Sequence, residues 1–194
     1  MKVVVPKALS KAGKNYLSEH NFELIEAPDD KQETILKVGK DADGIVLMTD
    51  PFDNQTLTKF TNLKIIARHG VGFDNVDEKF AGEHGVYVTI TPMANASTVA
   101  ETTIAEILDL SKNLTKISDE MRQGNFAYKL DHMGFDLSHK KIGVMGYGRI
   151  GRQVAEKANA LGMDVLIFDP FVKETKIGKL VDRDTLISQS DIIT

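Results

Sequence analysis

The sequence has no cysteine, no long apolar run and no cluster of basic residues. Without cysteine the chain can form neither a disulfide nor a thiolate metal site, which suits a reducing compartment. The N-terminal stretch MKVVVPK holds three consecutive apolar residues, far fewer than a signal peptide or a membrane span needs. The formal net charge of −4 disfavours a nucleic-acid partner. Together these features predict a cytoplasmic protein that binds no membrane and no nucleic acid.

The composition is that of an ordinary globular protein. Of the 194 residues, 42% are hydrophobic and 27% are charged, which is enough for one large domain or two modest ones. In the first half, short apolar segments alternate with stretches of helical periodicity, so we predict an α/β fold with a doubly wound parallel sheet. The predicted strands are residues 3–5, 22–26, 44–47, 64–67 and 86–90.

A junction follows at TPMANASTVAE, residues 91–101. Its first part shows no periodicity, and the apolar residues from 99 to 114 then recur at helical spacing. We therefore predict two domains, residues 1–97 and 98–194, with a cleft between them in which ligands collect.

Residues 139–169 carry the pattern of a strand, a glycine-rich turn, an amphipathic helix and a second strand. The turn reads GYGRIG, with Gly146, Gly148 and Gly151 at the spacing of a dinucleotide-binding fingerprint. Gly146 would permit the tight turn, Gly148 the close approach of a pyrophosphate, and Gly151 the close packing of the helix on the strand. This unit predicts a dinucleotide site.

The rest of the unit predicts which dinucleotide is bound. Backbone N–H groups at the helix start, from Arg149 and Ile150, would face the phosphates. Asp169 ends the second strand, where its carboxylate would accept hydrogen bonds from ribose hydroxyls and repel a 2′-phosphate. The sequence therefore favours NAD over NADP. A turn opened by Asp169 and Pro170 is the alternative, and Lys173 is the nearby cation that would weaken the discrimination.

A second glycine pair lies in ARHGVGFDNVD, residues 67–77, where a predicted strand gives way to a helix. Gly70 and Gly72 flank Val71, and such glycines free the backbone to point consecutive N–H groups at a small carboxylate. The alternative is that the glycines only shape a turn and that Asp74 only caps a helix.

These motifs resemble the D-isomer-specific 2-hydroxyacid dehydrogenase family over the whole chain, in the order GVGFDNVD, NASTVAE, GYGRIGRQVAEKANALGMDVLIFDP and SDIIT. The resemblance implies a flavodoxin-like substrate-binding domain followed by the first half of a Rossmann NAD-binding domain. It also implies hydride transfer between NADH and a small 2-keto acid, with a D-2-hydroxy acid as the reduced product. In relatives the long helix after residue 98 contributes to a dimer, so a homodimer is expected.

The resemblance also implies roles for individual residues. Val71 and Gly72 would donate main-chain N–H groups to the substrate carboxylate, with Val71 also near the nicotinamide. Asn95 matches a substrate-side position in formate dehydrogenase relatives. The cofactor-binding set consists of Val71, Gly146, Gly148, Arg149, Ile150, Gly151 and Asp169.

The family's catalytic arginine, glutamate and histidine lie downstream of the motif that here ends at Thr194. The chain is therefore expected to hold no catalytic residue, and its NAD-binding domain is expected to be incomplete. We interpret it as a fragment of an enzyme, cut within a strand at residues 191–194. A complete non-catalytic module that senses NAD is the alternative, and turnover by the intact gene product separates the two.

The substrate is less well specified. Phosphoglycerate dehydrogenases, which the motifs resemble closely, tend to carry an arginine where this chain has Met48, although Arg68 matches a second arginine of that group. A small unphosphorylated 2-keto acid is therefore the first prediction and phosphoglycerate the second. Arg68 and His69 would also be placed to tune the substrate pocket.

Two further patterns favour structural roles. Thr98 and Glu101 match a capping box, in which each side chain satisfies a backbone N–H at the helix start. Among the histidines, none has the partner spacing of a metal site, so no metal is predicted.

Overall fold

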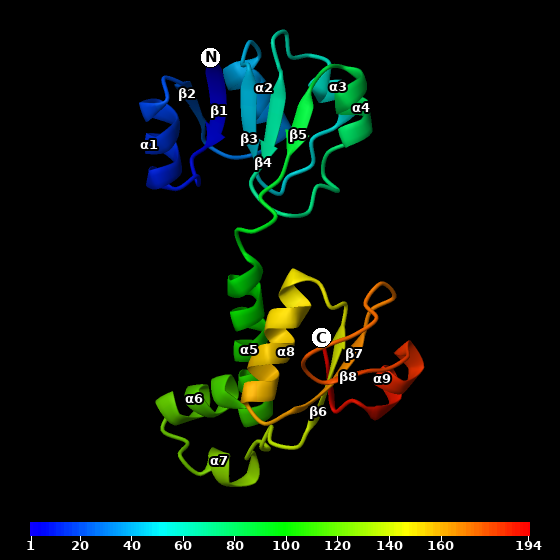
Figure 1. The fold of residues 1–194 in the computed structure, drawn as a ribbon. Helices are drawn as coiled ribbons and strands as arrows, with labels where there is room; N and C mark the ends of the chain where they lie inside the picture. The colour runs from blue at the N-terminus through cyan, green and yellow to red at the C-terminus, as the bar shows by residue number, and fades with distance from the viewer. The chain divides into compact units, whose positions relative to one another are not determined.

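The computed structural model describes residues 1–194, which form two compact units, Met1–Ala94 (unit 1) and Asn95–Thr194 (unit 2). Each unit has its own parallel sheet and its own hydrophobic core (Figure 1). None of the helices combines the length and the apolar character that crossing a membrane requires.

Unit 1 is built on a five-stranded sheet in the order β2-β1-β3-β4-β5, and every neighbouring pair is parallel. This is the strand order of flavodoxin-like folds. The predicted doubly wound sheet is thus confirmed, and each predicted strand overlaps an observed one. The strands are β1 (Lys2–Pro6), β2 (Glu23–Ala27), β3 (Gly44–Leu47), β4 (Ile65–Arg68) and β5 (Tyr87–Thr89).

Side-chain caps fix where most helices of unit 1 begin. Ser10, Asp53 and Asp77 each accept a hydrogen bond from a backbone N–H in the first turn of the helix that follows. The capping residue of the last helix is Asp77, so the alternative that Asp74 caps it is wrong. The helices are α1 (Lys11–Glu19), α2 (Gln32–Gly39), α3 (Asn54–Leu57) and α4 (Glu78–Glu83).

Unit 2 has a four-stranded parallel sheet in the order β8-β7-β6-β9. Counted along the chain within this unit, the order is third, second, first, fourth, as in the first half of a Rossmann sheet. The predicted fold class is therefore confirmed. The strands are β6 (Lys141–Met145), β7 (Asp164–Phe168), β8 (Lys179–Leu180) and β9 (Ile192–Ile193).

Helices α5 and α8 lie side by side in unit 2 (Figure 1). Small side chains make this close packing possible, since Ala100 of α5 and Ala155 and Ala158 of α8 are fully buried. The core beneath them comes from the central strands, with Ile142 and Ile167 also fully buried. The helices are α5 (Ala96–Lys112), α6 (Leu114–Arg122), α7 (Tyr128–Asp131), α8 (Arg149–Ala160) and α9 (Arg183–Gln189).

The start of α5 differs from the prediction. The helix begins at Ala96, and its N-cap is Asn95, whose side chain makes no capping hydrogen bond. Thr98 therefore lies inside the helix, while Ser97 Oγ donates to Glu101 Oε1 at 3.0 Å. The capping-box prediction is wrong, because the helix begins two residues before Thr98. Burial of Ala96 stabilises this earlier start.

Candidate functional site

The glycine-rich turn of unit 2 connects β6 to α8. Gly146 has φ +95°, a conformation that disfavours any residue with a side chain. A Cβ at Gly151 would overlap the carbonyl oxygen of Gly146, so this glycine is needed for packing within the protein. Gly148 differs from both, because its φ is −76° and a Cβ there would meet no protein atom within 4 Å. The fold itself does not require glycine at Gly148, whereas a closely approaching ligand would.

The N-terminus of α8 has no side-chain cap. Its first residues, Arg149 and Ile150, are exposed, so their backbone N–H groups and the positive end of the helix dipole lie at the surface. This helix has 12 residues, which gives it a well-developed dipole. The arrangement suits a phosphate or pyrophosphate group.

Asp169 lies at the end of β7, beside the glycine-rich turn. Its Oδ2 accepts a hydrogen bond from the Tyr147 N–H at 2.7 Å, and its Oδ1 accepts one from the Phe171 N–H at 2.8 Å. The bond from Tyr147, followed by that from Phe171, lowers the carboxyl pKa below its ordinary value of 3.8. The bond from Phe171 forms the turn that the sequence analysis gave as the alternative role of Asp169. Because an ionised carboxylate has about four acceptor positions, the turn leaves capacity for ribose hydroxyls.

Two hollows flank Asp169. One, of about 460 Å³, lies at the carboxyl ends of β7 and β8, where open parallel sheets bind ligands. The other, of about 740 Å³, lies between the start of α8 and the segment after β7. The first is lined by Phe168, Asp169, Val172, Lys179, Leu180, Val181, Asp182 and Thr185. The predicted set Gly146, Gly148, Arg149, Ile150, Gly151 and Asp169 is thus brought together in unit 2.

The loop after β4 in unit 1 leaves two backbone donors free. The N–H groups of Val71 and Gly72 donate to no acceptor within the chain. On one side the loop is fixed by the Thr91 N–H, which donates to the Gly70 carbonyl at 2.8 Å. Arg68 folds back on the same loop, and its Nη1 donates to the His69 carbonyl at 2.7 Å. Two adjacent free N–H groups suit a small carboxylate.

Asn75 holds the other side of this loop, a role that the sequence analysis missed. Its Nδ2 donates to the carbonyl of Met48 at 3.2 Å and to that of Asp50 at 2.8 Å. Its side-chain Oδ1 accepts from Arg68 Nε at 3.4 Å. Asn75 therefore joins the loop after β4 to the loop after β3. No local pattern reveals such a role, because its partners lie 25 and 27 residues away.

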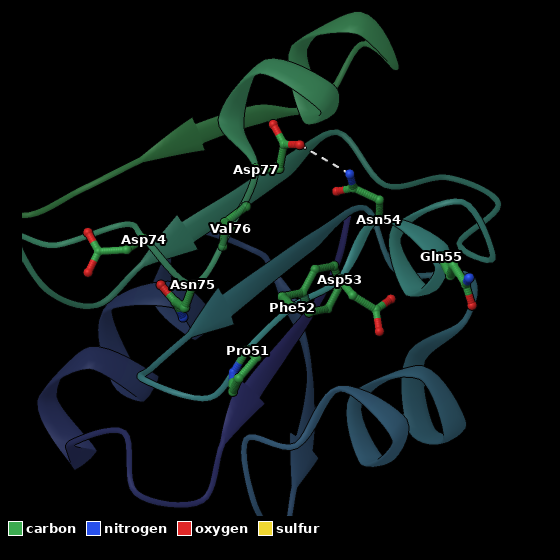
Figure 2. Close-up of a pocket in the computed structure, with 9 residues that line it drawn as sticks. All are labelled: Pro51, Phe52, Asp53, Asn54, Gln55, Asp74, Asn75, Val76 and Asp77. Atoms are coloured by element: carbon green, nitrogen blue, oxygen red, sulfur yellow. Dashed lines mark hydrogen bonds between the residues drawn. The ribbon is translucent and has the colours of Figure 1, made fainter.

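A separate open depression of about 830 Å³ lies beside α3 and α4. Figure 2 shows that the side chains of Asp53, Asp74 and Asp77 point in different directions around it. Because Asp53 and Asp77 accept hydrogen bonds from helix N–H groups, the pKa of each carboxyl is lowered. Three acidic side chains make this depression a poor place for an anionic substrate. The lining residues are Pro51, Phe52, Asp53, Asn54, Gln55, Asp74, Asn75, Val76 and Asp77.

Most of the histidines terminate helices. His20, His84 and His132 are the C-caps of α1, α4 and α7, and the ring of each lies beside that of the aromatic residue four positions earlier. The rings are stacked for His84 and His132 and tilted for His20. In each case Nδ1 lies within hydrogen-bond distance of that aromatic residue's carbonyl oxygen. No group of three or more histidine, aspartate or glutamate side chains is arranged to hold a metal ion.

Asn95, the remaining predicted substrate-side residue, opens unit 2 as the exposed N-cap of α5. Its side chain makes no capping bond and is free to contact another group. Val71 and Gly72, by contrast, belong to unit 1.

The fold and the glycine-rich turn together define a two-unit α/β protein of the dinucleotide-binding type. The chain belongs to the D-isomer-specific 2-hydroxyacid dehydrogenase family, whose catalytic-domain model matches residues 3–186. Over its full length it is 36% identical to a D-3-phosphoglycerate dehydrogenase of Archaeoglobus fulgidus, of which it covers 38%.

Solved structures agree with this assignment. An NAD-dependent formate dehydrogenase from Staphylococcus aureus, in complex with NAD, matches the whole chain with a TM-score of 0.86 and 29% identity. A D-lactate dehydrogenase from Aquifex aeolicus, in complex with NAD and lactic acid, matches 98% of the chain with a TM-score of 0.82 and 29% identity. The chain covers 64% of the former protein and 59% of the latter.

Proposed function

We propose that this chain provides the substrate-binding domain and the first half of the NAD-binding domain of an NAD-dependent D-2-hydroxyacid dehydrogenase. Unit 1 would bind the acid and unit 2 the dinucleotide. The observation that carries the proposal is the uncapped helix start behind Gly148, with the Asp169 carboxylate beside it. Family membership supplies the chemistry, which is oxidation or reduction at the carbon next to a carboxylate.

The residues of unit 2 fit an NAD molecule. The N–H groups of Arg149 and Ile150 would bind the pyrophosphate, and the open space at Gly148 would let it approach the backbone. Asp169 would accept hydrogen bonds from the adenosine ribose. When bound, NAD supplies or accepts the hydride. Both solved relatives described above hold NAD, which supports the same cofactor here.

Calorimetric titration of the chain with NAD⁺ and with NADP⁺ tests this proposal. We expect heat of binding with NAD⁺ and weaker binding of NADP⁺, because the Asp169 carboxylate would repel a 2′-phosphate. Asp169→Ala should narrow the ratio of the two affinities. Asp164→Ala is the matched control, since this exposed carboxylate lies at the opposite end of β7. No binding of either dinucleotide by the wild-type chain would refute the proposal.

The substrate we propose is a small, unphosphorylated 2-keto acid. The free N–H groups of Val71 and Gly72 would bind its carboxylate, and Asn95 would contribute a polar side chain. In the bound state Val71 would also contact the nicotinamide. Arg68 Nη1 is already bonded to the loop's own backbone, which makes this arginine less available to a phosphate.

Phosphoglycerate is the second candidate substrate, and the Archaeoglobus fulgidus relative favours it. Initial rates of NADH oxidation by the intact gene product should separate the candidates. We expect faster turnover with glyoxylate, pyruvate or hydroxypyruvate than with phosphohydroxypyruvate. A preference for the phosphorylated compound would reverse the order, and no turnover with any 2-keto acid would favour a non-catalytic NAD-binding module.

We further propose that the partner is a second copy of this chain and that the protein is cytoplasmic. Large apolar side chains are exposed along α5, α6, α7 and the segment after them, a feature that marks protein interfaces. They are Leu110, Leu114, Met121, Phe126, Leu130, Met133 and Phe135. Leu110→Asp should therefore shift the sedimenting species from dimer to monomer, whereas Tyr16→Asp, at an exposed site in unit 1, should not.

A further inference from the structure

Tyr147 stands between the first two glycines of the fingerprint, yet it is the buried member of the turn. Only 6% of its surface is exposed, while Gly146 and Gly148 on either side are exposed. Its side chain belongs to the hydrophobic core of unit 2, against which Val172 and Ile177 also pack. A residue in the middle of a ligand-binding turn is thus anchored in the protein interior.

The backbone of Tyr147 is held at both of its polar groups. The N–H donates to Asp169 Oδ2 at 2.7 Å, and the carbonyl accepts from Arg152 Nε at 3.0 Å. The Arg152 guanidinium also lies 5.3 Å from the centre of the Tyr147 ring, within the range of a cation–π interaction. The two peptide groups that flank Tyr147 are each held by a side chain, Asp169 on one and Arg152 on the other, and these bonds orient the glycine-rich turn.

The phenol of Tyr147 makes a third connection, to the irregular segment that follows Asp169. Its Oη lies 2.9 Å from Oγ1 of Thr175. Thr175 has a single hydroxyl proton, and a carbonyl oxygen, that of Ile177, lies only 2.6 Å away. Thr175 Oγ1 also accepts from the Ile177 N–H at 3.1 Å. The remaining lone pair of Oγ1 then accepts from the phenol, so Tyr147 is the donor and every polar atom is satisfied.

The segment 170–177 contains no helix or strand, and both of its ends are tied to the glycine-rich turn. At its start the Phe171 N–H donates to Asp169, which in turn holds the Tyr147 N–H. Near its end Thr175 holds the Tyr147 phenol. This closed arrangement surrounds the carboxylate that the proposed function assigns to the ribose. Ordering such a segment before the ligand arrives lowers the entropic cost of binding.

We propose that Tyr147 and Thr175 are positioning residues of the dinucleotide site, whose hydroxyl–hydroxyl bond keeps segment 170–177 and Asp169 in their binding arrangement. This inference rests on the proposed function, because it concerns the affinity of the same site. Neither side chain needs to touch the dinucleotide. The pair acts by restricting the backbone that does.

Calorimetric titration of the full chain with NAD⁺ tests the pair. Tyr147→Phe removes the donor and keeps the ring, and Thr175→Val removes the hydroxyl and keeps the shape. Tyr147→Phe should weaken NAD⁺ binding by about two- to tenfold, the loss of one hydrogen bond. Thr175→Val should weaken it by at least as much, because this variant also loses the two bonds between Thr175 Oγ1 and Ile177. Thr175→Ser should retain near-wild-type affinity. In the Thr175→Val background Tyr147→Phe should have no further effect, because the phenol has already lost its acceptor.

The control is Tyr87→Phe, which removes the hydroxyl of a tyrosine in unit 1 that is 76% exposed. It should leave NAD⁺ affinity unchanged. Wild-type NAD⁺ affinity in Thr175→Val would overturn the proposal. So would a double variant whose loss of NAD⁺ affinity equals the product of the losses in the two single variants.

Amide hydrogen exchange provides a readout that needs no dinucleotide. The Tyr147 and Phe171 amides should exchange faster in Tyr147→Phe and Thr175→Val than in the wild type and in Thr175→Ser. Unchanged exchange would overturn the positioning role. If the wild-type chain failed to bind NAD⁺, the proposed function would fail, and exchange would still decide whether the pair orders the segment.

Discussion

The two glycine-containing loops, one in each unit, hold their backbones in different ways. In unit 2 the turn at Gly146–Gly151 is fixed between its first two glycines, where Tyr147 is bonded through its N–H, its carbonyl and its phenol. In unit 1 the loop around Val71 is fixed only at its flanks, by bonds to Gly70 and from Asn75. Its central N–H groups have no partner in the chain.

This difference matches what each loop is proposed to bind. A pyrophosphate binds a backbone of fixed curvature at a helix N-terminus. The turn of unit 2 has such a backbone, because three bonds of Tyr147 hold it. A small carboxylate needs two free donors, and the loop of unit 1 leaves the N–H groups of Val71 and Gly72 free. Within the six-residue motif of unit 2, packing requires glycine at Gly151 but not at Gly148.

Gly151→Ala should have the largest effect on stability. Its Cβ would overlap the Gly146 carbonyl oxygen, so α8 must move away from the turn. We expect the free energy of unfolding of unit 2 to fall by about 3 kcal/mol, as overpacking in a tight site implies. Native-state hydrogen exchange, followed separately in the two units, measures this change. Equal protection of unit 2 in the variant and the wild type would contradict the packing role.

Asn75→Ala tests the flanks of the loop in unit 1. Removing the side chain leaves the Met48 and Asp50 carbonyls without their donor, at a cost of about 2 kcal/mol in the stability of unit 1. The same exchange measurement should show lower protection for residues 1–94 only. Asn54→Ala is the matched control, because its bond to Asp77 is exposed and its loss should cost under about 0.5 kcal/mol.

Gly148→Ala should separate access from packing. Its backbone conformation suits alanine and its Cβ meets no protein atom, so stability should stay within about 0.5 kcal/mol of the wild type. The added methyl would instead obstruct the pyrophosphate. We expect NAD⁺ affinity to fall about tenfold or more, equivalent to about 1.4 kcal/mol, in a calorimetric titration. Wild-type affinity would show that no ligand approaches the backbone at this glycine.

The sequence predicted the elements that depend on local pattern. The strands and the glycine spacing follow from apolar periodicity and from backbone geometry, which are properties of neighbouring residues. The contacts that order the loops were not predictable in this way, because Thr175 lies 28 residues from Tyr147 and within a segment that has no periodicity. The start of α5 was missed for a related reason. Burial of Ala96 and Ala100 in the core determines that end, and the local capping pattern does not.

The smallest expected effect is the pH dependence that Asp169 confers on unit 2. Hydrogen bonds from Tyr147 and Phe171 lower the folded-state pKa of this carboxyl below 3.8, so its ionised form stabilises the folded state. That contribution is fully present above the unfolded-state pKa and is lost as the pH falls through the lower, folded-state value. Asp169→Asn should therefore destabilise unit 2 at pH 7, and the difference from the wild type should shrink below about pH 4. Asp74→Asn in unit 1 is the control, because Asp74 is an exposed residue that lies outside the helices and strands of that unit. Urea unfolding at a series of pH values measures both differences. If the free energy of unfolding of the wild type exceeded that of Asp169→Asn by the same amount in strong acid as at pH 7, the charge of the carboxylate would not be what holds the turn.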